Sequence, residues 1–163
     1  MPMPSPGYTI TLRVDAPATQ RATSEIVHEV AAAGASVTGV DMAHSHGDTL
    51  TVDVTCDTVD AQHGEQIRAA LDALPGVHVR KMSDSTFLAH LGGKIEVTSK
   101  VAMKTRRDLS RAYTPGVARV SEAIAARPED ARRLTIKRNT VAVVTDGTAV
   151  LGMGDIGPSA ALP

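Results

Sequence analysis

Apolar and polar residues alternate along residues 1–80 in a way that predicts four β-strands. In YTITLRVD, residues 8–15, every second residue is apolar, which is the period of a strand with one buried face. The same period recurs in TLTVDVTC (49–56), and two further strands are predicted at SVTGVDMA (36–43) and VHVRKM (77–82). Each of these segments therefore predicts a strand that places one row of side chains in a core.

Two segments between these strands have the apolar spacing of a helix. In SEIVHEVAAAGAS (24–36), the apolar stripe begins at Ile26 and Val27, and Gly34 suits the left-handed residue that ends a helix. A second stripe has the spacing i, i+3, i+4, i+7 and is closed by Pro75-Gly76; its members are Ile67, Ala70, Leu71 and Leu74. The order βαββαβ predicts an α+β fold, a ferredoxin-like sandwich with two helices on one face of an antiparallel sheet.

From Ser83 onward the chain is more irregular and indicates a second domain. A helix is predicted from Pro115 to Ala126, and Arg127-Pro128 ends it. The run TVAVVTD (140–146) is continuously apolar, which favours a buried strand in a sheet covered on both faces. The domains predicted from these patterns are residues 7–81 and 82–163.

The charge distribution agrees with a boundary near the middle of the chain. Residues 1–80 carry 4 Lys/Arg and 10 Asp/Glu, whereas residues 81–163 carry 13 and 8, so the balance changes from −6 to +5. Opposite charges could favour docking or self-association, or they could belong to two solvated surfaces. The near absence of aromatics, with Tyr8 alone on a predicted strand of the acidic half, argues against nucleic-acid binding.

The remaining composition predicts a soluble cytoplasmic chain. No apolar run approaches the roughly 20 residues of a membrane helix, and the first residues lack the pattern of a signal peptide. Cys56 is the single cysteine, so no intrachain disulfide can form. It lies in phase with the apolar residues of 49–56, which favours a core thiol over a nucleophile.

Two sequence patterns resemble ligand-binding motifs, but neither is sufficient to predict a metal or cofactor site. His44 and His46 are two residues apart in a predicted polar turn with no evident third ligand, so no metal site is predicted. Gly152, Gly154 and Gly157 have the spacing G-x-G-x-x-G of a dinucleotide-binding turn. A true fingerprint joins a strand to a helix, whereas here Pro158 follows at once and no helix is predicted. We therefore interpret this motif as a turn-rich structural element, and predict no cofactor-binding residues.

Two longer strings in the second half, Y-T-P-G-V-A (113–118) and V-V-T-D-G-T-A-V-L-G-M-G-D-I-G-P (143–158), resemble the start of the catalytic region of bacterial malic enzymes. The resemblance covers roughly residues 84–163. It implies an α/β substrate domain, here only its beginning, and oxidative decarboxylation of malate to pyruvate with NAD or NADP and Mg or Mn. It also implies that Tyr113 is the acid that protonates the enolpyruvate carbon. The alternative is a core tyrosine that caps the helix beginning at Pro115.

The family's lysine base, carboxylate metal ligands and nucleotide domain follow the region matched here. This chain alone is therefore expected to be catalytically inactive, and the gene is expected to continue past the codon for Pro163. The animal-type arginine that grips the malate carboxylate has no counterpart, since Thr148 and Ala149 occupy that place. Arg111, Lys137 and Arg138 could hold a carboxylate. A solvated basic surface is favoured for all three.

The first half resembles an ACT-type regulatory module over about residues 7–81, through its topology and the segment EVAAAGASVTGVD. This resemblance implies a homodimer or higher homo-oligomer with a small-molecule effector at the interface. The implied effector residues are Asp15, Ala16, Gly34, Ala35 and Ser36. The usual glycine-containing turn before the first helix is replaced by Thr19-Gln20-Arg21, so a purely structural pairing module is the alternative.

A different class of function also remains open, namely a stand-alone ACT module that binds small molecules or oligomerises without enzymatic activity. The codons after Pro163 in the gene would separate this alternative from the malic enzyme.

Overall fold

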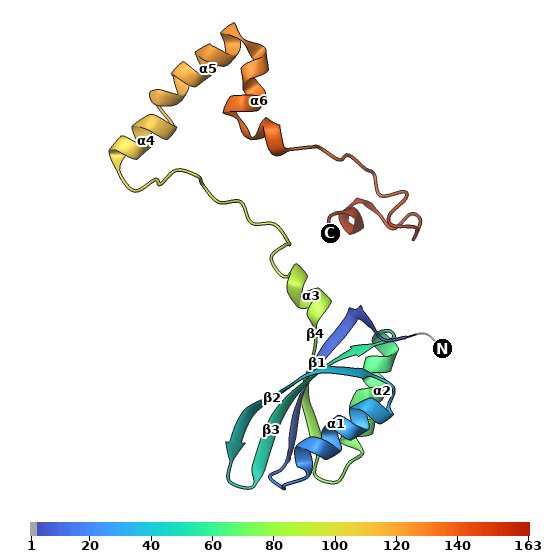
Figure 1. Ribbon diagram of the computed structural model, residues 1–163. Helices are drawn as coiled ribbons and strands as arrows, with labels where there is room; N and C mark the ends of the chain where they lie inside the picture. Colours follow the sequence, from blue (N-terminus) through green and yellow to red (C-terminus); the bar gives the residue numbers. More distant parts are fainter. Residues whose placement is uncertain (1–2) are drawn as a thin grey trace. The chain divides into compact units, whose positions relative to one another are not determined.

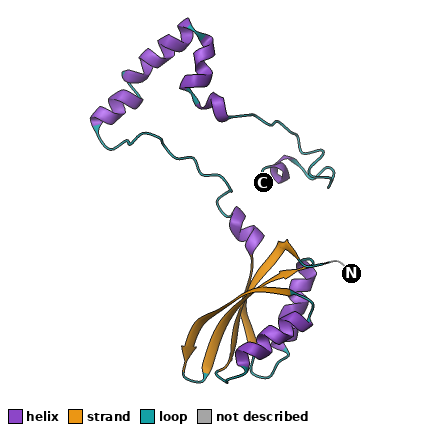
Figure 2. Cartoon of the chain, viewed as in Figure 1, coloured by secondary structure: helices purple, strands orange, loops and turns teal. Residues whose placement is uncertain are grey.

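The computed structural model describes residues 3–163 and divides the chain into two compact units, Met1–Lys94 and Ile95–Pro163. The first unit contains β1 (Ser5–Pro17), α1 (Ala22–Ala32), β2 (Ser36–His46), β3 (Thr49–Thr58), α2 (Ala61–Asp72), β4 (His78–Asp84) and α3 (Ser85–His90). The second contains α4 (Arg106–Ala112), α5 (Gly116–Ala126), α6 (Ala131–Leu134) and the 3₁₀ turns η1 (Pro128–Asp130), η2 (Ile136–Asn139) and η3 (Pro158–Ala161). Among the described residues, strands occur only in the first unit (Figure 2).

The first unit confirms the predicted βαββαβ order and the α+β class. Its four strands form one antiparallel sheet in the order β2-β3-β1-β4, with α1 and α2 against the same face (Figure 1). The ferredoxin-like arrangement follows from the sequence order because each helix crosses over one face and returns the chain to the sheet. The predicted domain 7–81 lies within this unit, which also includes α3.

The core lies between the helices and the sheet, and it is built from the predicted alternating rows. Leu12, Val14, Val54 and Cys56 of the two central strands are completely buried. The helices contribute their predicted stripes to the same core; the buried helical residues are Ala22, Ile26, Val30, Gly64, Ile67 and Leu71. Burial of a large aliphatic side chain contributes about 1.5–3 kcal/mol, so this core is the main source of stability of the unit.

The opposite face of the sheet carries paired polar side chains. The Thr9 hydroxyl donates to Asp57 at 2.5 Å, Thr11 and Thr55 hydroxyls lie 3.0 Å apart, and Arg13 Nη2 donates to Asp53 at 2.6 Å. These residues face one another because β1 and β3 pair Thr11 with Thr55 and Arg13 with Asp53. These cross-strand pairs therefore link β1 to β3 on this face of the sheet.

The hairpin between β2 and β3 is tighter than predicted. The predicted turn included His44 and His46, but both lie in β2 and pair with Thr51 and Thr49 of β3. Only Gly47 and Asp48 remain between the strands. The ladder extends this far because each added pair satisfies backbone groups that a longer loop would leave to water.

The second unit contradicts one prediction and confirms another. Residues 140–146 form no strand, and Val141, Val143 and Val144 are 87–94% exposed. A strand needs a neighbouring strand for its backbone groups, and no described residue pairs with this run. The predicted helix from Pro115 is confirmed as α5, which ends at Ala126 before Arg127 and Pro128. No helix within residues 3–163 is long and apolar enough to cross a membrane.

Candidate functional site

Tyr113 lies at the corner between two helices of the second unit, α4 and α5. Helix α4 begins with a capping box: the Thr105 hydroxyl accepts from Asp108 N–H, and the Asp108 carboxylate accepts from Thr105 N–H. The hydrogen bond from the Thr105 hydroxyl is the largest cause that lowers the pKa of Asp108. This cap defines where α4 starts, and Tyr113 follows its last residue, Ala112.

The Tyr113 backbone is held on both sides, whereas its side chain is exposed. Its N–H donates to Leu109 O at 2.8 Å, and its carbonyl oxygen accepts from Val117 N–H at 2.7 Å. The residue is 64% exposed, and its phenol makes no hydrogen bond to the described residues. The backbone of Tyr113 is thus anchored to both helices, and its side chain is solvent-exposed.

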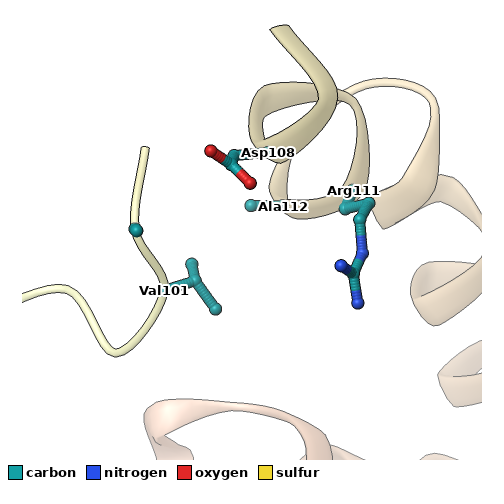
Figure 3. A pocket seen from close by; sticks show the side chains of 5 residues that line it. Val101, Asp108, Arg111 and Ala112 are labelled. Atoms are coloured by element: carbon teal, nitrogen blue, oxygen red, sulfur yellow. The ribbon is translucent and has the colours of Figure 1, made fainter. Parts of the chain in front are cut away.

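A cavity of about 340 Å³ lies beside α4, between this helix and residues 101–102 (Figure 3). Arg111 and Asp108 place opposite charges on its wall, and Val101 and Ala112 supply apolar contacts. The positive charge of Arg111 is among the causes that lower the pKa of Asp108, so the two side chains interact electrostatically on this wall. Of the three cations named from the sequence, Arg111 alone lines this cavity; Lys137 and Arg138 are exposed on η2.

The glycine-rich segment forms a closed loop, as the interpretation of a turn-rich element predicted. The Gly147 carbonyl accepts from the N–H groups of Ile156 and Gly157 at 3.3 and 3.2 Å, and Val150 is buried inside the loop. No strand precedes this loop, and the 3₁₀ turn η3 alone follows it within the described residues. A dinucleotide fingerprint joins a strand to an α-helix, and the described residues on either side of this loop form neither. That the motif binds no dinucleotide stays a prediction.

The carboxylate of Asp146 organises the start of the same loop. It accepts hydrogen bonds from the Thr148 hydroxyl at 2.8 Å and from Thr148 N–H at 3.1 Å. These bonds, led by the hydroxyl, lower the pKa of Asp146. The T-D-G string is therefore a local turn that closes on itself through Asp146.

The effector residues expected in the first unit form two groups at opposite ends of the sheet. Asp15 of β1 pairs with Thr51 of β3. Ser36 of β2 pairs with Asp57 of β3, which in turn pairs with Thr9 of β1. Six residues of β1 separate these levels, which corresponds to about 20 Å at 3.3 Å per residue. Within one copy, the structure therefore does not bring Asp15 and Ala16 together with Gly34, Ala35 and Ser36.

The Gly34 turn has the predicted left-handed conformation, with a φ of +95°. It borders a cavity of about 350 Å³ that also includes His63, Asp60 and Gln66. His63 Nδ1 accepts from Val59 N–H at 3.1 Å, and Nε2 lies 2.8 Å from the Ala33 carbonyl oxygen. Because Nδ1 is an acceptor, Nε2 must carry the proton and donate to Ala33.

Sequence reasoning found no role for His63, since one of its two partners, Ala33, lies 30 residues away in the chain. Two other structural residues, Gly116 and Gly147, were also missed. The one signal in the sequence for these two glycines was their position inside the strings Y-T-P-G-V-A and T-D-G.

Cys56 was predicted as a core thiol, and its complete burial confirms this. Burial is the largest cause that raises its pKa to about 11.

Comparison with known proteins identifies relatives of this chain. Residues 92–163 match the family described as "Malic enzyme, N-terminal domain". An NAD-dependent malic enzyme from Geobacillus stearothermophilus is 53% identical over 140 residues, 86% of this chain and 29% of that protein. An NADP-dependent malic enzyme from Rhizobium meliloti (strain 1021) is 48% identical over 71 residues, 44% of this chain and 9% of that protein. The chain thus spans less than a third of the length of these relatives.

Two solved structures are among those similar to the chain. A crystal structure of an NAD-dependent malic enzyme from Thermotoga maritima has 49% identity and a TM-score of 0.45, covering 50% of this chain and 22% of that one. The ACT domain from a GTP pyrophosphokinase of Chlorobium tepidum has 9% identity and a TM-score of 0.39, covering 47% and 95%.

Proposed function

We propose, on the premise that this chain belongs to the malic enzyme family, that it is part of an enzyme that oxidises and decarboxylates malate to pyruvate and carbon dioxide. The observation that carries the proposal is the 53% identity over 140 residues to a named NAD-dependent malic enzyme. Within the matched family segment, 92–163, lies Tyr113 on its helix–helix corner.

We assign the final proton transfer to Tyr113. After decarboxylation the product is the enolate of pyruvate, and its C=C electron pair must take one proton at carbon to give the ketone of pyruvate. The phenol O–H breaks, a C–H bond forms, and the phenolate recovers its proton from solvent. The anchored backbone and the exposed hydroxyl of Tyr113 support this role, because a proton donor must reach the substrate and hold its position.

Hydride transfer to NAD or NADP and polarisation of the carbonyl by Mg or Mn belong to the same proposed reaction. Residues 3–163 bring together no group of three or more His, Cys, Asp or Glu residues suited to a metal ion. They also form no strand–glycine–helix unit. We expect the 163-residue chain alone to show no malate-dependent reduction of the nucleotide.

The test is a kinetic assay of the gene product that includes any continuation of the reading frame past Pro163. We expect malate-dependent reduction of NAD or NADP with Mg or Mn. Tyr113→Phe should lower kcat by about 10²-fold or more, since general acids contribute about 10²–10⁴-fold. Tyr8→Phe, at the other tyrosine of the chain, is the matched control and should leave kcat unchanged. Absence of malate oxidation, or a full kcat in Tyr113→Phe, would contradict the proposal.

We further propose that the first unit is an ACT-like regulatory or pairing domain. Its sheet, two helices and continuous core support this, since they form a complete layer structure without the second unit. An effector that touches both predicted groups must lie between copies, because about 20 Å separates the groups within one copy. A cytoplasmic homodimer is the assembly that fits this proposal.

Sedimentation velocity of the 163-residue chain tests the pairing, and a dimer is the expected result. A chain that stays monomeric at all accessible concentrations would contradict it.

A further inference from the structure

Gly116, the first residue of α5, is a glycine for steric reasons. Its φ lies outside the left-handed region, so its backbone conformation is open to other residues. A Cβ atom at this position would lie 2.5 Å from Arg111 O, 2.6 Å from Ser110 O and 2.9 Å from Arg111 Cα. All three are backbone atoms of the last turn of α4, so no side-chain rotation could relieve the contact.

This close approach determines how α4 and α5 meet around Tyr113. The Tyr113 N–H is bonded to Leu109 of α4, and the Tyr113 carbonyl is bonded to Val117 of α5. The Tyr113 N–H is therefore tied to α4 and the Tyr113 carbonyl to α5. A change in the distance between α4 and α5 must change the position of the Tyr113 side chain.

We infer that Gly116 is a positioning residue for Tyr113, and that its missing side chain holds the phenol where it can protonate the substrate. The inference rests on the proposed function of Tyr113. Ordinary van der Waals contact begins near 3.4 Å, so an alanine at position 116 must move α5 away from α4 by about 1 Å. A misplacement of about 1 Å in a catalytic group can reduce the rate by about 10²-fold.

The first test is a double-mutant cycle in the gene product used for the kinetic assay. Gly116→Ala should lower kcat by about 10²-fold, with a smaller change in the KM for malate, because the loss falls on the proton-transfer step. In a Tyr113→Phe background, Gly116→Ala should have almost no further effect on kcat, since its partner is already absent. Dinucleotide affinity should stay at the wild-type value.

Gly7→Ala is the matched control, because it adds the same atom at a glycine that also lies outside the left-handed region. The nearest atom to its Cβ would be Ser5 Oγ at 3.7 Å, an ordinary contact. We expect no change in kcat from this substitution.

A second test uses the 163-residue chain and needs no activity. The sequence contains two tyrosines and no tryptophan, so Tyr8→Phe leaves Tyr113 as the sole tyrosine reporter. In NMR spectra, Gly116→Ala should shift the Tyr113 ring resonances, while Gly7→Ala should leave them in place. Unchanged resonances in Gly116→Ala would overturn the inference.

The outcomes separate the two proposals. A full kcat in Tyr113→Phe would overturn the proposed role of Tyr113 and this inference with it. A large loss in Tyr113→Phe, combined with an independent further loss from Gly116→Ala, would overturn the positioning role alone. Loss of dinucleotide affinity in Gly116→Ala would also overturn it, because that result indicates a general structural role.

Discussion

The Asp15 carboxylate of β1 and the Arg80 guanidinium of β4 are joined by two hydrogen bonds, of 2.9 Å from Nε and 2.5 Å from Nη2. The other carboxylate oxygen of Asp15 accepts from the Thr51 hydroxyl at 2.7 Å. Asp15 thus joins three neighbouring strands through its side chain. The residue expected from its family resemblance to contact an effector is already engaged within its own sheet.

These contacts predict an acid-sensitive first unit. The Thr51 hydroxyl is the largest cause that lowers the pKa of Asp15, and the hydrogen bond from Arg13 is the largest that lowers the pKa of Asp53. A carboxyl with a lower pKa in the folded state stabilises that state above its unfolded pKa of about 3.9. The contribution is lost as the pH falls through the folded pKa. Urea unfolding should therefore show a stability that declines below about pH 4.

Asp15→Asn should reduce the free energy of unfolding at neutral pH by about 1 kcal/mol, because the charged hydrogen bonds are partly exposed to solvent. Its stability should also depend less on pH in the acid range. Asp48→Asn is the control, since the Asp48 side chain forms no hydrogen bond or ion pair with described residues. If Asp15→Asn and the unmodified chain lose the same unfolding free energy between neutral and acid pH, the carboxylate of Asp15 is not the source of the pH dependence.

His63→Ala should destabilise the first unit by about 1–3 kcal/mol, because Val59 N–H would lose its acceptor and Ala33 O its donor. Chemical denaturation followed by circular dichroism measures this loss. Gln66→Ala removes an exposed side chain that lines the same cavity and should change stability little. Similar losses in the two variants would show that the His63 hydrogen bonds contribute nothing specific.

Cys56 should resist thiol reagents in the folded chain. The residue is completely buried, and a pKa of about 11 leaves very little thiolate near neutral pH. Reaction with a disulfide reagent should be slow without denaturant and rapid in urea. Rapid modification of the folded chain would contradict the assignment of Cys56 to the core.

Gly147→Ala and Gly152→Ala should differ strongly, although both glycines have a φ of +79°. A Cβ at Gly147 would collide with the backbone of Gly157 and Pro158, whereas nothing lies within 4 Å of one at Gly152. Gly152→Ala should cost about 1–2 kcal/mol through its backbone conformation alone. Gly147→Ala should also open the loop.

Hydrogen exchange of the Ile156 and Gly157 amides measures this opening, because both amides donate to Gly147 O. Faster exchange is expected in Gly147→Ala than in Gly152→Ala. Equal exchange rates in the two variants would show that the contact with Gly157 does not matter.

Local patterns were sufficient for the order of the strands and helices of the first unit up to β4 and for its core, although not for the length of the β2–β3 hairpin. The alternating rows that include Leu12 and Val54, and the helical stripes with Ile26 and Ile67, determine which faces are buried. Periodicity is local information, because a side chain's face depends only on its position along its own strand or helix. The strand prediction for residues 140–146 was wrong because it also used local information alone. An apolar composition does not provide the neighbouring strand that a β-strand needs.

The sequence by itself determined the α+β fold of the first unit and the buried thiol. Its long matching strings singled out Tyr113 as the candidate acid. Only the tertiary structure decided that Asp15 is bonded to Arg80, that His63 joins Val59 to Ala33, and that Gly116 must lack a side chain. These relationships join residues through space. They depend on strand register and on the approach of two helices, which no spacing along the chain specifies.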